Sequence, residues 1–273
     1  MARNFGVQRL QQVLIGIFAF VLACTGSIRS THAEDAVSSP LAPPPLSKEC
    51  QVPGMVEASS VPLPNTTNAL KERKRIRILT IGATDNGGRH SLRGSYQDLI
   101  ERTLELTIKG LDVVLIKRGI SGELAANAAR RLKIEVAVNK PDLVLWQVGT
   151  NDAMAFVPVE DLRETITSTV HWLRNHRIDV VLVGLHYSPH MLHDPSYQAI
   201  RQMMRQVTDT EKVLRIRLYE AMEMILQAQS IEERNQANEF ALTEAGYTCM
   251  AEYVARAITA GVFAKPETSL PRR

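Results

Sequence analysis

The sequence has little net charge, few aromatic residues and only three cysteines, and each shortage narrows the candidate functions. Its 32 Lys and Arg residues nearly balance 29 Asp and Glu residues, which leaves a formal net charge of +3. Because no long basic run alternates with aromatic residues, we expect no nucleic-acid-binding surface. Gly87 and Gly88 form no phosphate-binding loop, since no lysine or properly spaced third glycine follows them. The remaining composition, 45% hydrophobic and 22% charged residues among 273, is typical of a globular domain with extra segments.

The N-terminus has the pattern of a secretory signal. Two arginines precede an apolar run over residues 13–23, and the small residues Thr31 and Ala33 fit a cleavage site before Glu34. We therefore expect an exported protein, periplasmic or secreted, with no transmembrane span in the mature chain. A retained membrane helix is one alternative, although the run is short for a bilayer. A lipoprotein signal, in which Cys24 becomes the lipidated first residue, is another.

Two cysteines, Cys50 and Cys249, remain after cleavage before Glu34. An exported protein meets an oxidising compartment, where two such residues can form one disulfide. That bond would tie the segment before the domain to its last helix. The alternative is that Cys249 is simply a small, buried apolar residue. The sequence alone leaves both alternatives open.

Composition divides the chain into a signal peptide (1–33), a proline-rich N-terminal extension (34–74), a domain (75–265) and a C-terminal tail (266–273). Apolar, β-rich runs predict strands over residues 76–82, 111–119, 142–149, 178–186 and 213–220. Amphipathic stretches predict helices over residues 95–108, 123–138, 159–176, 195–210 and 243–260. Because several strands are apolar on both faces, the sequence predicts an α/β fold, a three-layer α/β/α sandwich with a five-stranded parallel sheet.

The loops that follow the predicted strands carry the most specific motifs. Ligands of parallel sheets bind at the carboxyl ends of the strands, so these loops are where a site is expected. The segments "RGISGE" (118–123), "VGTNDA" (148–153) and "LTEAGY" (242–247) together resemble the blocks of the SGNH, or GDSL-type, hydrolase family. The resemblance implies a flavodoxin-like fold and ester hydrolysis. It also places the Asn151 side chain and the Gly122 backbone N–H at the family's oxyanion hole.

The catalytic triad of that family is not reproduced. Where the family has Gly-Asp-Ser, this chain has Gly82, Ala83 and Thr84, and Asn238 and Ala241 stand at the positions of the family's Asp and His. A hydroxyl nucleophile needs an adjacent base and a group that orients that base. An alanine cannot accept a proton, an asparagine carries no charge to stabilise an imidazolium, and the threonine methyl crowds attack. The resemblance therefore implies a hydrolase fold whose triad is degenerate.

Three interpretations follow for the residues that remain. Gly122 and Asn151 can still bind an acylated or carbohydrate ligand through N–H donors, without any cofactor. They can also be purely structural, with the glycine required by backbone geometry and the asparagine pinning neighbouring loops. In the third interpretation the protein is an active carboxylic or carbohydrate esterase, in which Thr84 acts with a displaced histidine base. The candidate bases are His90, His186 and His190.

The remaining candidates have simpler explanations. Four residues at and after the end of the fourth predicted strand are of types that bind metals, namely His186, His190, His193 and Asp194. Pro189 prevents them from lying on one continuous helical face. Because exposed histidines are common in loops, no metal is expected. Asp152 is expected to brace the turn into the next helix. Core packing accounts for Trp146 and Trp172. A protein partner would be indicated by an exposed apolar patch beside the pocket.

Overall fold

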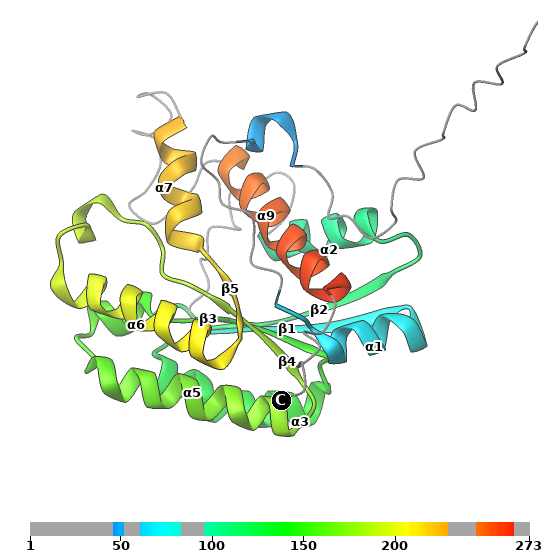
Figure 1. Cartoon of the computed structure of the whole chain (residues 1–273), viewed down its shortest axis with the longest axis horizontal. Helices are drawn as coiled ribbons and strands as arrows, with labels where there is room; N and C mark the ends of the chain where they lie inside the picture. Colours follow the sequence, from blue (N-terminus) through cyan, green and yellow to red (C-terminus); the bar gives the residue numbers. More distant parts are fainter. Residues whose placement is uncertain (1–45, 52–60, 83–95, 229–243, 265–273) are drawn as a thin grey trace, which may run out of the picture. The chain divides into compact units, whose positions relative to one another are not determined.

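The fold is built around a parallel five-stranded sheet, seen in a computed structural model that describes residues 46–51, 61–82, 96–228 and 244–264. The strand order is β2-β1-β3-β4-β5 (Figure 1). The strands are β1 (Arg75–Gly82), β2 (Asp112–Gly119), β3 (Leu143–Gln147), β4 (Asp179–Val183) and β5 (Leu214–Ile216). The predicted α/β fold with a five-stranded parallel sheet is confirmed.

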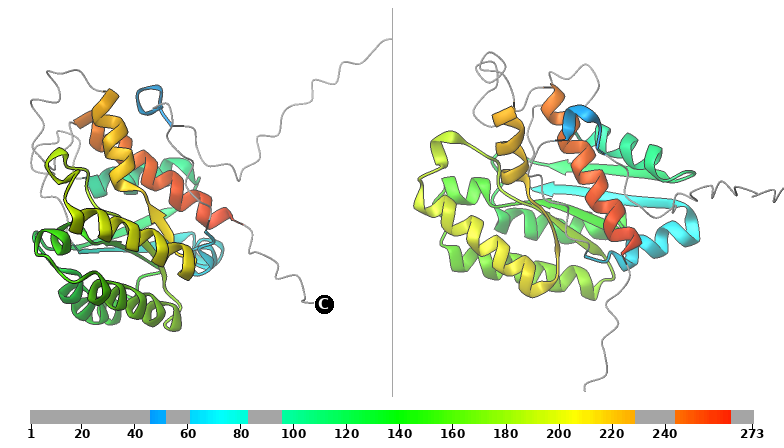
Figure 2. Two further views of the ribbon diagram at one scale, coloured as in Figure 1. Left: turned by 60° about the vertical axis from the view of Figure 1, so that its left-hand side comes forward. Right: turned by 45° about the horizontal axis from the view of Figure 1, so that its top comes forward.

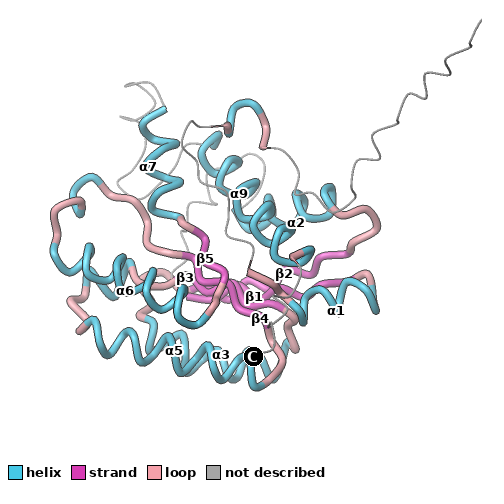
Figure 3. The backbone as a smooth tube through the Cα atoms, viewed as in Figure 1, coloured by secondary structure: helices cyan, strands magenta, loops and turns pink. Residues whose placement is uncertain are grey.

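Helices cover both faces of the sheet, as the apolar strands predict. Consecutive residues of β1 point to opposite faces, and Ile78 and Leu79 are both fully buried. On one face α3 (Ala125–Asn139), α5 (Val159–Asn175) and α6 (Pro195–Glu211) pack in a row, and on the other α2 (Tyr96–Thr107) packs against α9 (Glu244–Phe263) (Figures 1 and 3). Right-handed crossovers explain this division, because the chain moves from β1 to β2 in one direction and then returns past β1 to β3.

The second face also carries the last helix of the described chain. Figure 2 shows α9 lying across the sheet beside α2, and the two helices pack against each other. Within the described ranges, no helix combines the length and the apolar character needed to cross a bilayer.

The fifth strand is shorter than the sequence predicted. A strand was expected over residues 213–220, but β5 ends at Ile216 and helix α7 (Leu218–Ala228) begins two residues later. Leu218, Met222 and Ile225 are buried, and their spacing of four and three residues is that of one helix face. A short apolar run that enters a helix directly is difficult to distinguish from a longer strand by its pattern alone.

Helix α1 (Pro64–Arg73) lies in the stretch that composition assigns to the extension, where no helix was expected. Pro64 occupies its first turn, where the missing N–H is no loss. The carboxylate of Asp179, at the start of β4, accepts hydrogen bonds from the Thr66 backbone N–H, the Thr66 hydroxyl and the Asn65 amide, each at 2.8 Å. The N-terminus of α1 is therefore satisfied by a residue distant in sequence, which local composition cannot reveal.

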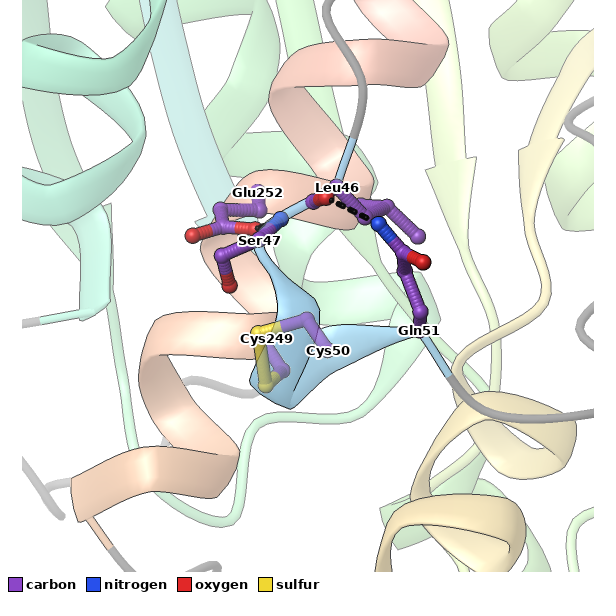
Figure 4. The surroundings of a disulfide bond; sticks show 6 residues. All are labelled: Leu46, Ser47, Cys50, Gln51, Cys249 and Glu252. Atoms are coloured by element: carbon purple, nitrogen blue, oxygen red, sulfur yellow. Dashed lines mark hydrogen bonds between the residues drawn. A yellow bond between two sulfur atoms is a disulfide. The ribbon is translucent and has the colours of Figure 1, made fainter.

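A disulfide joins Cys50 to Cys249 and fixes the short 3-10 helix η1 (Lys48–Cys50) to α9 (Figure 4). Both cysteines are buried. The Ser47 backbone N–H donates to a Glu252 carboxylate oxygen at 2.9 Å, which adds a second link between the same two segments. The first of the two alternatives for these cysteines, a bond between the N-terminal segment and the last helix, is confirmed.

Candidate functional site

The carboxyl ends of four strands align at one edge of the sheet. In the strand register Gly82 lies beside Gly119 on one side and Gln147 on the other, and Gln147 lies beside Val183. The two central strands approach closely at this point. A Cβ atom added to Gly82 would lie 2.0 Å from the Gln147 carbonyl oxygen, and φ there is +95°. Only glycine fits at the end of β1, so this edge is built on a fixed backbone contact.

The loop after β2 presents Gly122 to solvent. The Ile120 N–H donates to the Gly82 carbonyl at 3.1 Å, and the Glu123 N–H donates to the Ile120 carbonyl at 3.2 Å, so the loop is anchored to β1. Gly122 has φ +77°, and no heavy atom lies within 4 Å of a Cβ built on it. Its requirement for glycine is therefore conformational rather than steric. Among the described residues its N–H has no hydrogen-bond acceptor.

An arginine on α3 holds the same loop from behind. Arg131 donates to both carboxylate oxygens of Glu123, from Nε at 3.0 Å and from Nη2 at 2.7 Å. Its Nη2 also donates to the Arg118 carbonyl at 2.6 Å. The Glu123 side chain is only 5% exposed, so this two-point ion pair is largely shielded from water. The residue that follows Gly122 is thus locked to the helix that the loop leads into.

The loop after β3 is joined to the loop after β2 by two hydrogen bonds. The Asn151 side-chain amide, on helix α4 (Thr150–Met154), donates to the Glu123 carbonyl at 3.1 Å. The neighbouring Asp152 carboxylate accepts the Ala125 backbone N–H at 2.9 Å and the Gly149 backbone N–H at 3.2 Å. Asp152 is 2% exposed. It braces the turn, as the sequence predicted, and it does so across two loops.

The electrostatic environment of Asp152 is set by burial. Burial raises the pKa of its carboxyl group, and the hydrogen bonds from Ala125 and Gly149 partly oppose the rise. A buried acceptor of two backbone N–H groups is well suited to hold loops in place, because removing it would leave both donors unsatisfied. The two Asp152 bonds and the Asn151 bond to Glu123 form one unit, which we call the loop clip.

The loop clip leaves two donors at the edge. The Asn151 amide nitrogen carries two protons, and the Glu123 carbonyl is its only acceptor in the described part of the chain. Its second N–H and the N–H of Gly122 are donors on adjoining loops. A pair of such donors can receive a carbonyl, a carboxylate or an oxyanion. Three large apolar side chains on the same two loops are exposed, namely Ile120, Met154 and Phe156.

His186 lies at the same edge, after β4, in a buried polar network. Its Nε2 is 2.9 Å from the Gln147 amide nitrogen, and its Nδ1 is 3.4 Å from the Thr150 hydroxyl. The His186 backbone N–H donates to that hydroxyl at 3.0 Å, and the Tyr197 phenol donates to the His186 carbonyl. Burial raises the pKa of the Tyr197 phenol. Both ring nitrogens of this candidate base therefore already face polar neighbours.

The structure places only one of the other predicted site residues, His190. Thr84, His90, Asn238 and Ala241 lie outside the described residues. His190 is exposed on the 3-10 helix η3 (Pro189–Met191).

The candidate metal ligands after β4 have other surroundings. Asp194, one of them, instead caps helix α6 by accepting the Tyr197 N–H at 2.8 Å. His193 is exposed. In the described ranges no three His, Cys, Asp or Glu side chains are placed to hold a metal ion.

Sequence reasoning missed the residues that hold the site together. Arg131, Gln147, Thr150 and Tyr197 come from four different elements. Only Thr150 belongs to a motif, the segment 148–153, and its role there was not predicted. The one available signal is the spacing of Glu123 and Arg131, eight residues apart, which places opposite charges about two helical turns from one another.

Part of this chain is similar in sequence to two curated proteins. The chain is 28% identical over 105 residues to an arylesterase from Vibrio mimicus, covering 36% of this chain and 52% of that protein. It is 28% identical over 108 residues to the esterase TesA from Pseudomonas aeruginosa, covering 39% of this chain and 53% of that protein. The chain thus spans about half the length of these curated relatives.

Solved structures show the same fold. An acetylxylan esterase from Geobacillus stearothermophilus, solved as a catalytic mutant, superposes with a TM-score of 0.56 at 21% identity, over 67% of this chain and 94% of that one. A lipase/acylhydrolase from Enterococcus faecalis gives a TM-score of 0.55 at 21% identity, over 67% and 95%. The predicted resemblance to GDSL-type hydrolases is confirmed at the level of fold. Residues 49–264 match a named family, and this chain belongs to it: the non-GDSL lipase-like family.

Proposed function

We propose that this protein is a catalytically degenerate hydrolase-fold protein that binds an acylated or carbohydrate ligand through the N–H groups of Gly122 and Asn151. The observation that carries the proposal is the loop clip. The oxyanion donors are braced by buried hydrogen bonds, although Thr84, Asn238 and Ala241 replace the three triad residues. A site maintained without its nucleophile is suited to binding rather than to turnover.

Two further features support an ester-type ligand. The donors can receive a carbonyl oxygen, and the exposed side chains of Ile120, Met154 and Phe156 on the same loops offer apolar contact for an acyl group. The relatives named above are an arylesterase, an esterase and an acetylxylan esterase. These names describe those proteins, and they make an ester ligand the first class to test here.

We also propose that the protein is exported, periplasmic or secreted, after removal of residues 1–33. The Cys50–Cys249 disulfide supports this, because such bonds persist in oxidising compartments. N-terminal sequencing of the mature protein tests the proposal. A first residue at Glu34 is expected, whereas a lipidated Cys24 would contradict this cleavage site in favour of membrane anchoring.

Restoring the triad tests whether the pocket is an intact shell, that is, whether its donors are still positioned to support ester hydrolysis once the triad residues are present. The variant Thr84→Ser, Asn238→Asp, Ala241→His is expected to hydrolyse short-chain aryl esters. In that background Asn151→Ala should lower the rate about 100- to 1,000-fold, which is the usual effect of losing one oxyanion donor. Asn175→Ala, which changes an exposed asparagine at the end of α5, is the matched control and should leave the rate unchanged.

The alternative is an active esterase that uses Thr84 with a displaced histidine. The described contacts of the two His186 ring nitrogens are with Gln147 and Thr150. Failure of the restored triad to hydrolyse any short aryl ester, in a variant that folds normally, would overturn the intact-shell proposal. So would an Asn151→Ala variant that matches its control.

A further inference from the structure

A groove separates helices α3 and α5 on the face of the sheet away from α9. It has a volume of about 300 Å³, and its lining includes Ala126, Arg130 and Lys133 from α3 and Thr165, Ser168 and Trp172 from α5. We call it the α3–α5 groove. The two helices lie side by side along their length (Figure 1). The volume is at the lower end of the range for small-molecule sites, roughly 300–1,000 Å³.

Trp172 is the aromatic surface of this groove. The sequence predicted a core tryptophan, which is correct for Trp146, but Trp172 is only partly buried and lines the opening. The reason is its position on the side of α5 that faces α3 rather than the sheet. His176 stacks on the indole with ring centroids 4.0 Å apart. The Lys133 ammonium group lies over the ring, 5.8 Å from its centroid.

The groove carries unpaired positive charge. Among the described residues neither Arg130 nor Lys133 forms an ion pair, and Arg130 only donates a hydrogen bond to the Asn127 side chain at 2.5 Å. Three acidic residues of α5 line a neighbouring depression that shares Ser168 with the groove, namely Glu160, Asp161 and Glu164. Because an exposed cation–π contact is weak, about 0.5–1 kcal/mol, Lys133 can leave the indole for a carboxylate.

The hydroxyl oxygens of two α5 residues, Thr165 and Ser168, are hydrogen-bond acceptors at the groove. Thr165 donates its hydroxyl proton to the Asp161 carbonyl at 2.8 Å, and Ser168 donates to the Thr165 carbonyl at 3.2 Å. Their protons are therefore committed to the helix backbone, and their oxygen lone pairs face outward. A ligand that fits would supply hydroxyl donors, a flat apolar face and a negative charge.

The groove begins next to the candidate site. Ala126 is four residues beyond Gly122, and the preceding Ala125 N–H belongs to the loop clip. Lys133 follows seven residues later, which is about 10 Å along a helix. A chain-like ligand that is held at the Gly122 and Asn151 donors could therefore extend from them along α3 toward Trp172.

We propose that the α3–α5 groove binds an acidic saccharide, with a sugar ring on the Trp172 indole, the carboxylate at Arg130 and Lys133, and sugar hydroxyls donating to Thr165 and Ser168. The proposal rests on the proposed function for the position of the ligand's ester group, which lies at the Gly122 and Asn151 donors. Binding in the groove itself requires no ester and is measured separately.

Digalacturonate is the probe, and tryptophan fluorescence with calorimetry is the assay. Trp146 is fully buried, so a change in emission reports on Trp172. Lys133→Gln and Arg130→Gln should each weaken binding roughly tenfold, the effect of losing one charge-assisted contact. Trp172→Phe keeps an aromatic face and should remove the emission change while heat is still released. Lys140→Gln, at the exposed end of the same helix, is the matched control and should match the wild type.

Galactobiose, which lacks the carboxylates, is expected to bind at least tenfold more weakly than digalacturonate. Equal affinity for the two disaccharides, no measurable binding, or a Lys133→Gln variant equal to Lys140→Gln would each overturn the proposal. Asn151→Ala separates it from the proposed function. This variant should lose more affinity for the O-acetylated form than for digalacturonate itself, which has no ester group for the Asn151 donor to bind. If digalacturonate fails to bind while acetylated sugars still depend on Asn151, only the groove proposal falls.

Discussion

Replacing Asp152 should loosen the candidate site and lower the stability of the fold. The loss of stability can be estimated from the hydrogen bonds that Asp152 accepts. Its carboxylate is 2% exposed and accepts two backbone N–H groups, from Ala125 and Gly149. Each buried donor left unsatisfied costs about 1–3 kcal/mol. Asp152→Ala leaves two such donors and should therefore lower the free energy of unfolding by about 2–6 kcal/mol. Asp152→Asn keeps one acceptor oxygen and places an NH₂ group at the other donor, so it should cost about half as much.

The pH dependence of this effect has a definite sign. Burial raises the pKa of Asp152 above its unfolded value of about 3.9. The folded protein then binds the proton more tightly than the unfolded chain, so the stability linked to this group is fully present below pH ~3.9 and is lost as pH rises through the folded pKa. The destabilisation caused by Asp152→Asn should therefore be larger near pH 3.5 than at pH 7.

Urea unfolding of wild type, Asp152→Ala and Asp152→Asn at both pH values measures these differences. Glu164→Gln, an exposed change on α5, is the control and should shift stability by less than about 0.5 kcal/mol at either pH. A loss below 1 kcal/mol for Asp152→Ala would refute the loop clip. A destabilisation by Asp152→Asn that shrinks at low pH would refute the argument from burial.

The remaining predictions concern backbone and covalent constraints. Replacing Cys50 and Cys249 by serine should lower stability by about 2–4 kcal/mol because the bond closes a separation of 199 residues, and equal unfolding midpoints with and without reductant would contradict this. Gly82→Ala should prevent normal folding, because the added Cβ would lie 2.0 Å from the Gln147 carbonyl oxygen. Soluble expression with a native circular dichroism spectrum would contradict this and show that the strands can separate. In Gly122→Ala the added Cβ meets no neighbour, so the free energy of unfolding should fall by only about 1–2 kcal/mol, because φ is +77°. Thermal unfolding measures this loss, and a larger loss would indicate a further contact at Gly122.

The sequence is sufficient for the parts of the structure that depend on local pattern. Residues 78–81 are buried on both faces of the sheet, and such runs identify a parallel sheet covered by helices. Asp152 follows Asn151 at the start of a short helix, so its bracing role could also be predicted. Gly122 and Asn151 were found from a family resemblance, because no single motif in either loop specifies an oxyanion site.

Long-range contacts account for what the sequence could not predict. Helix α1 depends on Asp179, whose carboxylate lies 113 residues from Thr66. The neighbours of His186 come from β3 and α4, 36 to 39 residues away. Trp172 could not be placed at a groove from its own helix, because the opening exists only where α3 lies alongside. In each case the deciding partner belongs to another element.

Hydrolysis of a short-chain aryl ester by the purified mature protein tests the central claim most directly, with Thr84→Ala measured alongside the wild type. The account predicts that both proteins are inert above the buffer rate while the Asn151 and Gly122 donors still bind ligand. Turnover by the wild type that Thr84→Ala abolishes would contradict it. The protein would then be an active esterase, and His90, His186 and His190 would be the residues to test for its base.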